Sequence, residues 1–362
     1  MSRLNGFLAG VRVVDLTNYL PGPLATLLLA DLGAEVVKVE SPQGDALQTL
    51  GPRDAAGRPA YYEAISAGKH TVTLDLKAPA DHARFIALCD AADVVIESFR
   101  PGVMARLGLA PATLRERNPR LIHVSLSGYG RSGPHSREAG HDVNYLARAG
   151  ALTGNGAGGR AVVFAPPLAD CLASMFGLST LLAALYSRER DGRGCDIDIA
   201  LADVIMPLQV YALAELGATG RAPMRESDLL NGGAAFYRIY VTADGAEVAL
   251  GAIEPKFWAA FCEAAGHPEW IARQDEPLPQ RALTADVAAW FAAAPVEECR
   301  RRLGPADCCF SELCTLDEAV AGAHNAARRL VRRDADGALH ALYPAWVDGE
   351  PPQVRVPRRP VD

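Results

Sequence analysis

Apolar residues in the first half of the chain form short continuous runs, separated by longer segments with helical spacing. Five runs have the length and composition of buried strands: residues 11–16, 35–40, 71–76, 93–97 and 121–127. Residues 23–32 and 78–91 instead repeat apolar side chains at helical intervals. Strands that alternate with helices of about ten residues indicate crossover connections. The pattern predicts an α/β fold with a largely parallel, Rossmann-like sheet.

The pattern changes in the second half. Residues 168–190 indicate one long helix, followed by a strand at 195–200 and a helix at 202–216. Residues 217–233 contain Gly217, Gly220 and Pro223 and are typical of a linker. Two further strands and two helices predict a smaller α+β unit: residues 237–241, 247–251, 256–265 and 285–294.

These segments predict three parts. Residues 1–217 form the large Rossmann-like domain, and residues 218–330 form the small α+β domain. The tail at residues 331–362 is rich in proline and arginine, and we expect an extended arm that returns to the large domain.

Composition narrows the class of protein. Apolar residues make up 49% of the 362 and charged residues 22%, as in ordinary globular chains. The formal charge of −7 argues against nucleic-acid binding, while a small polyanionic ligand needs only a few local cations. No apolar stretch reaches the roughly 20 residues of a membrane span, and the first ten residues lack a signal-peptide pattern. We therefore expect a cytoplasmic protein that does not insert into membranes.

The number and spacing of the cysteines also agree with a cytoplasmic protein. The eight cysteines are scattered, mostly in apolar runs, with no CxxC pair and no Cys/His cluster at zinc spacing. We expect buried, reduced thiols and no metal site.

One motif is misleading. Residues 128–133 (GYGRSG) fit the GxGxxG pattern after a predicted strand. A dinucleotide site also needs a helix that begins within the motif, and here Pro134 and a polar loop follow. The motif does not indicate a nicotinamide cofactor.

The segment 128–145 (GYGRSGPHSREAGHDVNY) concentrates polar side chains after a strand end, where open α/β sheets bind ligands. His141 is one of eight histidines, so a surface role is the plainer interpretation. A histidine with an ordinary pKa near 6.5 nevertheless exchanges protons at neutral pH, which makes it a candidate base.

Two acids and two arginines are further candidates, each with a structural alternative. Asp170 stands where the long helix begins; it either interacts with the helix dipole or acts as a base or nucleophile that the helix end keeps ionised. Glu254 precedes Pro255 at a strand-to-helix junction and either caps the helix or orients a histidine. Arg100 and Arg106 follow a predicted strand end and are either surface charges or phosphate ligands.

These segments together resemble the class III CoA transferase family, which includes carnitine-CoA transferases, formyl-CoA transferase and alpha-methylacyl-CoA racemase. The similarity runs over nearly the whole chain and is carried by residues 10–16, 21–23, 31–40, 73–77, 99–102, 106–109 and 128–130. Residues 139–145 (AGHDVNY) and 251–257 (GAIEPKF) look like the racemase branch. No glycine-rich flap of the transferase type is present in the small domain.

The resemblance implies an interlocked homodimer and an acyl-CoA substrate, with no cofactor beyond the CoA that is part of the substrate. It implies that His141 and Asp170 are the two bases of a 2-methylacyl-CoA epimerase and that Glu254 pairs with His141. The alternative is a CoA transferase in which Asp170 is the nucleophile. The residues expected to bind substrate or CoA are Tyr19, Phe99, Arg100, Arg106, Gly130, Asp142 and Tyr145.

Overall fold

The computed structural model describes residues 3–361, and its contacts divide the chain into two compact units. The first unit contains residues 1–149, 164–208 and 320–362, and the second contains residues 150–163 and 209–319. Both units are therefore discontinuous in sequence, unlike the expected domains 1–217 and 218–330. The segment 150–163 joins the second unit because Arg225 donates hydrogen bonds to the carbonyl oxygens of Leu152 and Asn155.

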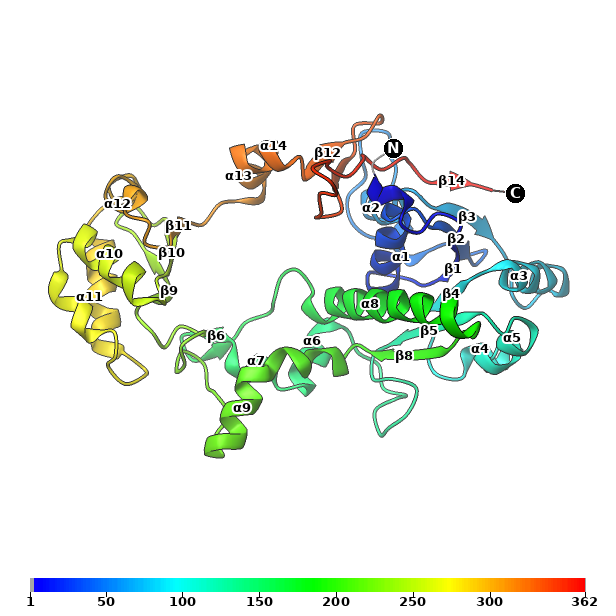
Figure 1. The fold of residues 1–362 in the computed structure, drawn as a ribbon, viewed down its shortest axis with the longest axis horizontal. Helices are drawn as coiled ribbons and strands as arrows, with labels where there is room; N and C mark the ends of the chain where they lie inside the picture. Colours follow the sequence, from blue (N-terminus) through cyan, green and yellow to red (C-terminus); the bar gives the residue numbers. More distant parts are fainter. Residues whose placement is uncertain (1–2, 362) are drawn as a thin grey trace. The chain divides into compact units, whose positions relative to one another are not determined.

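The first unit is built on a parallel sheet of seven strands (Figure 1). Every neighbouring pair in this sheet is parallel, as the alternation of strands and helices predicts. In spatial order the strands are β14 (Arg359–Pro360), β3 (His70–Thr73), β2 (Glu35–Glu40), β1 (Arg12–Leu16), β4 (Val94–Glu97), β5 (Ile122–Ser127) and β8 (Asp196–Ala200).

Helices cover this sheet. α1 (Pro21–Asp31) packs against α8 (Leu168–Asp191), and Ser174 of α8 donates a 2.6 Å hydrogen bond to the carbonyl oxygen of Pro21. α3 (Pro79–Ala91) and α5 (Pro111–Arg117) share a core with the strands, in which Phe85 and Leu121 are fully buried. The remaining helices of this unit are α2 (Ala60–Ser66), α4 (Val103–Arg106), α6 (Asp142–Arg148) and α14 (Ala323–Arg328).

By length and composition, α8 could cross a membrane. Its 24 residues include a window of mean hydropathy 1.7, so the expectation that no segment reaches this length and apolarity is wrong. The same composition occurs in core helices, and α8 contacts α1, α6, β5 and β8. These contacts account for the buried part of α8, which is 39% of that window.

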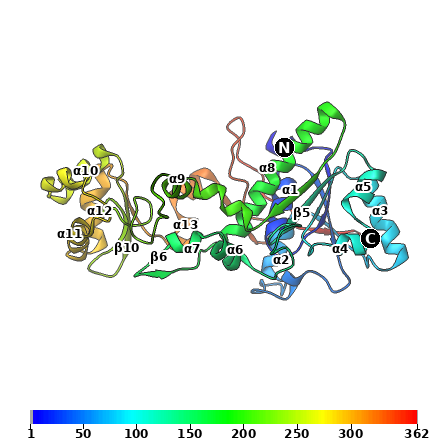
Figure 2. The same cartoon turned by 90° about the horizontal axis from the view of Figure 1, so that it is seen from below.

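The second unit combines an antiparallel sheet with helices, as the hairpin signal predicts. Its strands are β9 (Tyr237–Val241), β10 (Glu247–Gly251) and β11 (Phe310–Glu312), with β10 in the centre. Trp258, Phe261 and Phe291 are fully buried in its aromatic core. Figure 2 shows the helices of this core beside the strands; they are α10 (Pro255–Ala265), α11 (Arg281–Ala292) and α12 (Val296–Leu303).

Around residue 205 the structure departs from the sequence pattern. The helix expected at 202–216 is replaced by two short 3₁₀ turns, and α9 (Val210–Thr219) begins only at residue 210. Pro207 explains the shift, because proline lacks the backbone N–H and clashes with the preceding turn of an α-helix. The remaining short elements are α7 (Ala151–Gly154), β6 (Gly156–Ala157), β7 (Arg160–Ala161) and α13 (Leu316–Ala321).

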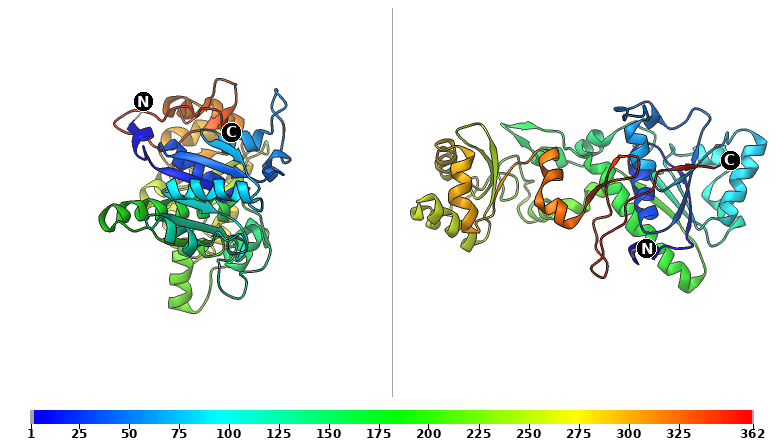
Figure 3. Two further views of the ribbon diagram at one scale, coloured as in Figure 1. Left: turned by 90° about the vertical axis from the view of Figure 1, so that its right-hand side faces the viewer. Right: turned by 90° about the horizontal axis from the view of Figure 1, so that it is seen from above.

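The C-terminal segment lies along the first unit, and Figure 3 shows it (red) beside the N-terminal strands (blue). Its hairpin, β12 (Val331–Arg333) and β13 (Leu339–Ala341), precedes β14, which pairs with β3. Arg355 forms a two-pronged ion pair with Asp31 of α1, at 2.8 and 2.6 Å. The tail is thus a structural part of this unit.

Candidate active site

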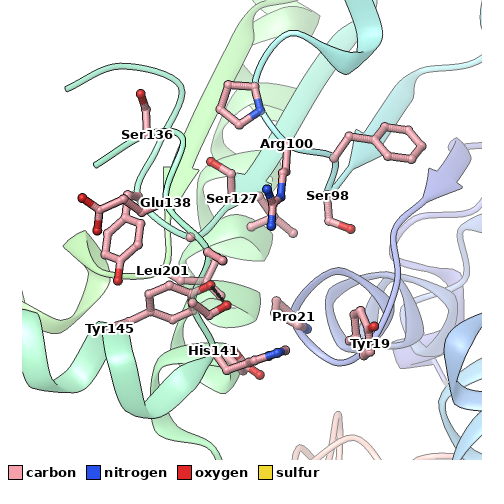
Figure 4. A pocket seen from close by; sticks show the side chains of 18 of the residues that line it. Tyr19, Pro21, Ser98, Arg100, Ser127, Ser136, Glu138, His141, Tyr145 and Leu201 are labelled. Atoms are coloured by element: carbon pink, nitrogen blue, oxygen red, sulfur yellow. Dashed lines mark hydrogen bonds between the residues drawn. The ribbon is translucent and has the colours of Figure 1, made fainter. Parts of the chain in front are cut away.

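A cavity of about 460 Å³ opens at the carboxyl edge of the parallel sheet. Its walls come from the segments that follow β1, β4, β5 and β8 and from the start of α8. The expected residues that line it are Tyr19, Phe99, Arg100, His141, Tyr145 and Asp170. Figure 4 shows the side chains of Tyr19, Arg100, His141 and Tyr145 around this space. The topology therefore brings together residues spread over more than 150 positions of the chain.

The backbone of His141 is held from both sides. Its N–H donates a 3.0 Å hydrogen bond to Oδ1 of Asn144, and the Tyr145 hydroxyl donates to the carbonyl oxygen of Gly140 at 2.5 Å. A Cβ on Gly128 or Gly140 would lie within 2.8 Å of Tyr145 atoms, so any larger residue at either position would have to displace the Tyr145 side chain. The exposed imidazole meets the ring of Tyr19 edge-on, with ring centroids 6.3 Å apart.

Asp170 is half-buried in the first turn of α8. Burial and the nearby Asp142 carboxylate raise its pKa to about 6, although His141 acts in the opposite direction. The direction of this shift is opposite to the lowering of the pKa that the helix end alone would give. Burial is the larger cause, and Asp142 adds to it because it occupies the helix end: its Oδ1 accepts the N–H groups of Ala169 at 2.6 Å and of Asp170 at 3.2 Å.

Three other expected ligand-binding residues do not line the cavity. Arg106 is exposed at the end of α4. Gly130 has φ +77°, and a Cβ there would contact Ala200 and Asp198, so this glycine permits a turn against β8. Asp142 directs its carboxylate to α8.

Glu254 belongs to the second unit, whereas His141 and Asp170 belong to the first. It stands at the N-cap position of α10, as the junction predicts, but its exposed side chain makes no capping hydrogen bond.

A second cavity, of about 810 Å³, adjoins the first and was not foreseen. Both cavities are lined by Asn18, Tyr19, Ser98 and Phe99, so one elongated ligand can extend through both. The only sequence signal was position, because its lining follows the ends of β1, β2, β3 and β4.

Two acids in the wall of this second cavity already have partners. Asp45 forms a 2.7 Å ion pair with the buried Lys38, and Glu40 accepts hydrogen bonds from Tyr62 and Gln48. Lys77 in the same wall is exposed.

The cysteines and the metal-ligand side chains add no further centre. Four of the eight cysteines are buried, two are partly buried, and Cys309 and Cys314 are exposed, so the expectation of buried thiols holds only in part. Within residues 3–361, no three His, Cys, Asp or Glu side chains are grouped as a metal ion would require.

The fold and the cavity define an α/β protein with titratable side chains at the carboxyl edge of a parallel sheet. The chain belongs to CoA-transferase family III, whose model matches residues 8–361. Members of this family are enzymes and include racemases and CoA transferases.

Relatives of both activities are similar to this chain. Alpha-methylacyl-CoA racemase of Mus musculus is 36% identical over 333 residues, which cover 89% of this chain and 81% of the mouse protein. Succinyl-CoA:mesaconate CoA-transferase of Haloarcula marismortui is 33% identical over 81% of this chain and 76% of its own. The crystal structure of Rv3272 from Mycobacterium tuberculosis superposes with a TM-score of 0.84 at 31% identity, over 98% of this chain and 96% of that one.

Proposed function

We propose that this protein interconverts the epimers of 2-methylacyl-CoA thioesters by exchanging the hydrogen on the α-carbon. The observation that carries the proposal is that His141 and Asp170 line the same cavity. The 36% identity to a racemase over 89% of the chain supports the same reaction.

The proposed chemistry needs one base on each face of the α-carbon. One base removes the proton, and the electron pair of the C–H bond moves into the thioester to form an enolate. The other base, in its acid form, then delivers a proton to the opposite face. A carboxyl group with a pKa of about 6, as for Asp170, exists in both forms near neutral pH, which suits it to either role.

Arg100 is the cationic side chain in the wall of this cavity, and we assign it to the thioester oxygen or to a nearby polar group of CoA. The N–H groups of Ala169 and Asp170 do not fill this role, because Asp142 accepts both. The remainder of CoA extends into the adjoining cavity, and Glu254 orients His141. CoA enters as part of the substrate, no further cofactor takes part, and the enzyme works in the cytoplasm.

A CoA transferase is the second candidate, and the 33% identity to a CoA transferase over 81% of the chain favours it. In that reaction the Asp170 carboxylate attacks the thioester carbonyl, the C–S bond breaks, and CoA leaves as the thiolate while an acyl-aspartyl anhydride forms.

Incubation in deuterium oxide without a second acid separates the two. An epimerase incorporates one α-deuterium and inverts the centre, which mass spectrometry and chiral analysis detect. His141→Ala and Asp170→Ala should each abolish inversion. Each variant should still incorporate α-deuterium (deuterium wash-in) into the one epimer whose α-hydrogen the remaining base can remove. Glu254→Gln should act as a weakened His141, and Glu263→Gln, an exposed glutamate of α10, is the matched control. A wild-type enzyme that moves CoA between acids and never labels the α-carbon would rule out the epimerase.

We also propose that the working form is an interlocked homodimer. α9 supports this, because Val210, Tyr211, Leu213 and Leu216 are exposed and none of its residues is buried within one chain. Light scattering at micromolar concentration should give twice the mass of the 362-residue chain. A monomer under these conditions would contradict the dimer.

A further inference from the structure

One carboxylate joins helix α6, whose N-cap residue is His141, to helix α8, which carries Asp170. Asp142 is the first residue of α6 and follows His141 directly, while its Oδ1 accepts the N–H groups of Ala169 and Asp170 in the first turn of α8. The segment that positions one base is therefore fastened to the segment that positions the other.

α8 needs this partner. The first N–H groups of an α-helix have no acceptor within the helix, and a side chain at the N-cap usually supplies one. The N-cap residue of α8 is Pro167, which provides no capping hydrogen bond. An anion from another element meets the positive end of this 24-residue helix instead.

Charge adds a second consequence. Asp142 places a negative charge beside Asp170 and, after burial, is the next cause that raises the pKa of Asp170. Other ionisable groups line the cavity with Asp170 or lie beside it: His141 at the N-cap of α6, Tyr145 of α6, Cys171 of α8, Tyr19 after β1, Arg100 after β4, and Tyr129 and Glu138 after β5. Of the groups that act on Asp170 directly, His141 works against Asp142.

We infer that Asp142 is a positioning residue, which sets the spacing of His141 and Asp170 and keeps Asp170 in a form that can exchange protons. This inference rests on the proposed function, and it differs from the role expected from the sequence, in which Asp142 contacts CoA. Spacing matters for inversion, because both bases must reach one carbon. It matters much less for exchange on a single face.

Two variants separate the effect of the Asp142 hydrogen bonds to α8, called the tether below, from the effect of the Asp142 charge. Asp142→Asn keeps an oxygen that can accept the N–H groups but removes the charge. The acid limb of wash-in from the epimer served by Asp170 should then move to lower pH, by roughly one unit. Asp142→Ala also removes the tether, so the ratio of inversion to wash-in should fall at least tenfold. If Asp142→Ala does not fold, Asp142→Asn still tests the role of the charge, and an unshifted profile would then overturn the inference.

The matched control is Asp244→Asn. Asp244 also accepts an N–H at a helix start, that of Val296 in α12, and it belongs to the second unit. Its variant should leave the pH profile and the ratio unchanged. A wild-type enzyme without deuterium wash-in would overturn the proposed function. If the wild type exchanges normally, this inference alone would be overturned by an unshifted pH profile in Asp142→Asn together with an unchanged ratio of inversion to wash-in in Asp142→Ala.

Discussion

Both compact units have apolar cores, but they differ in what else they bury. Beneath the cavities, the first unit buries Asp15, Lys38 and Lys69, each at most 1% exposed. The second unit instead buries stacked aromatic rings, such as Trp258 against Phe261 with centroids 5.3 Å apart. The difference follows from position, because the carboxyl ends of β1 and β2 must hold polar loops in place. An aromatic core supplies stability, but it offers few directional hydrogen bonds that could hold a loop in one conformation.

The buried charges fasten the loop that contains Tyr19. The Asp15 carboxylate accepts hydrogen bonds from the N–H and hydroxyl of Thr17 and from the hydroxyl of Thr26. Lys69 donates to Thr26 and lies 3.3 Å from Asp15. Tyr19 follows in the left-handed region, at φ 64°, so its backbone needs such support.

Breaking this network should have the largest effect. Asp15→Ala leaves Lys69 buried without its partner, and we expect the first unit to lose about 3–5 kcal/mol. Hydrogen exchange of the β1–β2 region, resolved by mass spectrometry, measures the loss separately from the second unit. Asp54→Ala, at an exposed ion pair with Arg58, is the control and should change little.

The pH dependence of the same pair has a defined sign. Burial opposes ionisation of Asp15, but Lys69 and Lys38 outweigh it, so the pKa of Asp15 is lowered. The contribution of Asp15 to the unfolding free energy is therefore complete above its pKa in the unfolded chain, which is near 4. It is lost as pH falls through the lower pKa of the folded state. In the Asp15→Ala variant this acid-dependent part of the unfolding free energy should be absent. An unchanged acid limb of stability would contradict the role given to Asp15.

Substitutions of Arg100 and Arg106 test which of the two guanidinium groups contacts the CoA ester. Arg100→Ala should weaken CoA-ester binding by about 1.5–3 kcal/mol, the range for a hydrogen bond to a charged group. Arg106→Ala should weaken it less, because Arg106 lines neither cavity. Calorimetry with an acyl-CoA measures both, and equal losses would return Arg106 to the site.

In the aromatic core a smaller loss is expected. Trp258 Nε1 donates a 3.0 Å hydrogen bond to the carbonyl oxygen of Trp270, and Trp258→Phe removes this donor as well as part of the ring. We expect the second unit to lose about 1–3 kcal/mol. Denaturant unfolding gives the loss, and the pH profile of wash-in should stay unchanged. A shifted profile would show that the two cores are coupled.

The smallest effect concerns Asp170 and has the opposite sign. Because its pKa is raised to about 6 in the folded state, its ionisation opposes folding, and stability falls as pH rises from about 4 through 6. Asp170→Asn should therefore stabilise the protein at pH 7 by about 1 kcal/mol, after a discount for partial exposure, while it abolishes inversion. Thermal unfolding at pH 4 and pH 7 checks it, because the gain should appear only at pH 7.

Local patterns determined much of this protein. The strand runs, the long helix at 168–190 and the family-like segments are properties of neighbouring residues, so periodicity and spacing are sufficient to find them. The expected helix at 202–216 shows the limit of periodicity. Its apolar spacing is helical, but Pro207 lacks the backbone N–H that an α-helix needs at this position. His141 is a candidate from a segment that also carries the family resemblance, and Asp170 is a candidate from its place at the start of the predicted long helix.

Only the tertiary structure decided the electrostatics of the site and the hydrogen bonds between its distant segments. Nothing local shows that Asp142 accepts the N–H groups of a helix that begins 26 residues later, or that this contact helps raise the pKa of Asp170 instead of leaving it low. Nor does sequence order show that Arg100 faces a cavity while Arg106 does not. These properties depend on burial and on contacts between distant segments, which exist only once the parallel sheet has brought its carboxyl ends together.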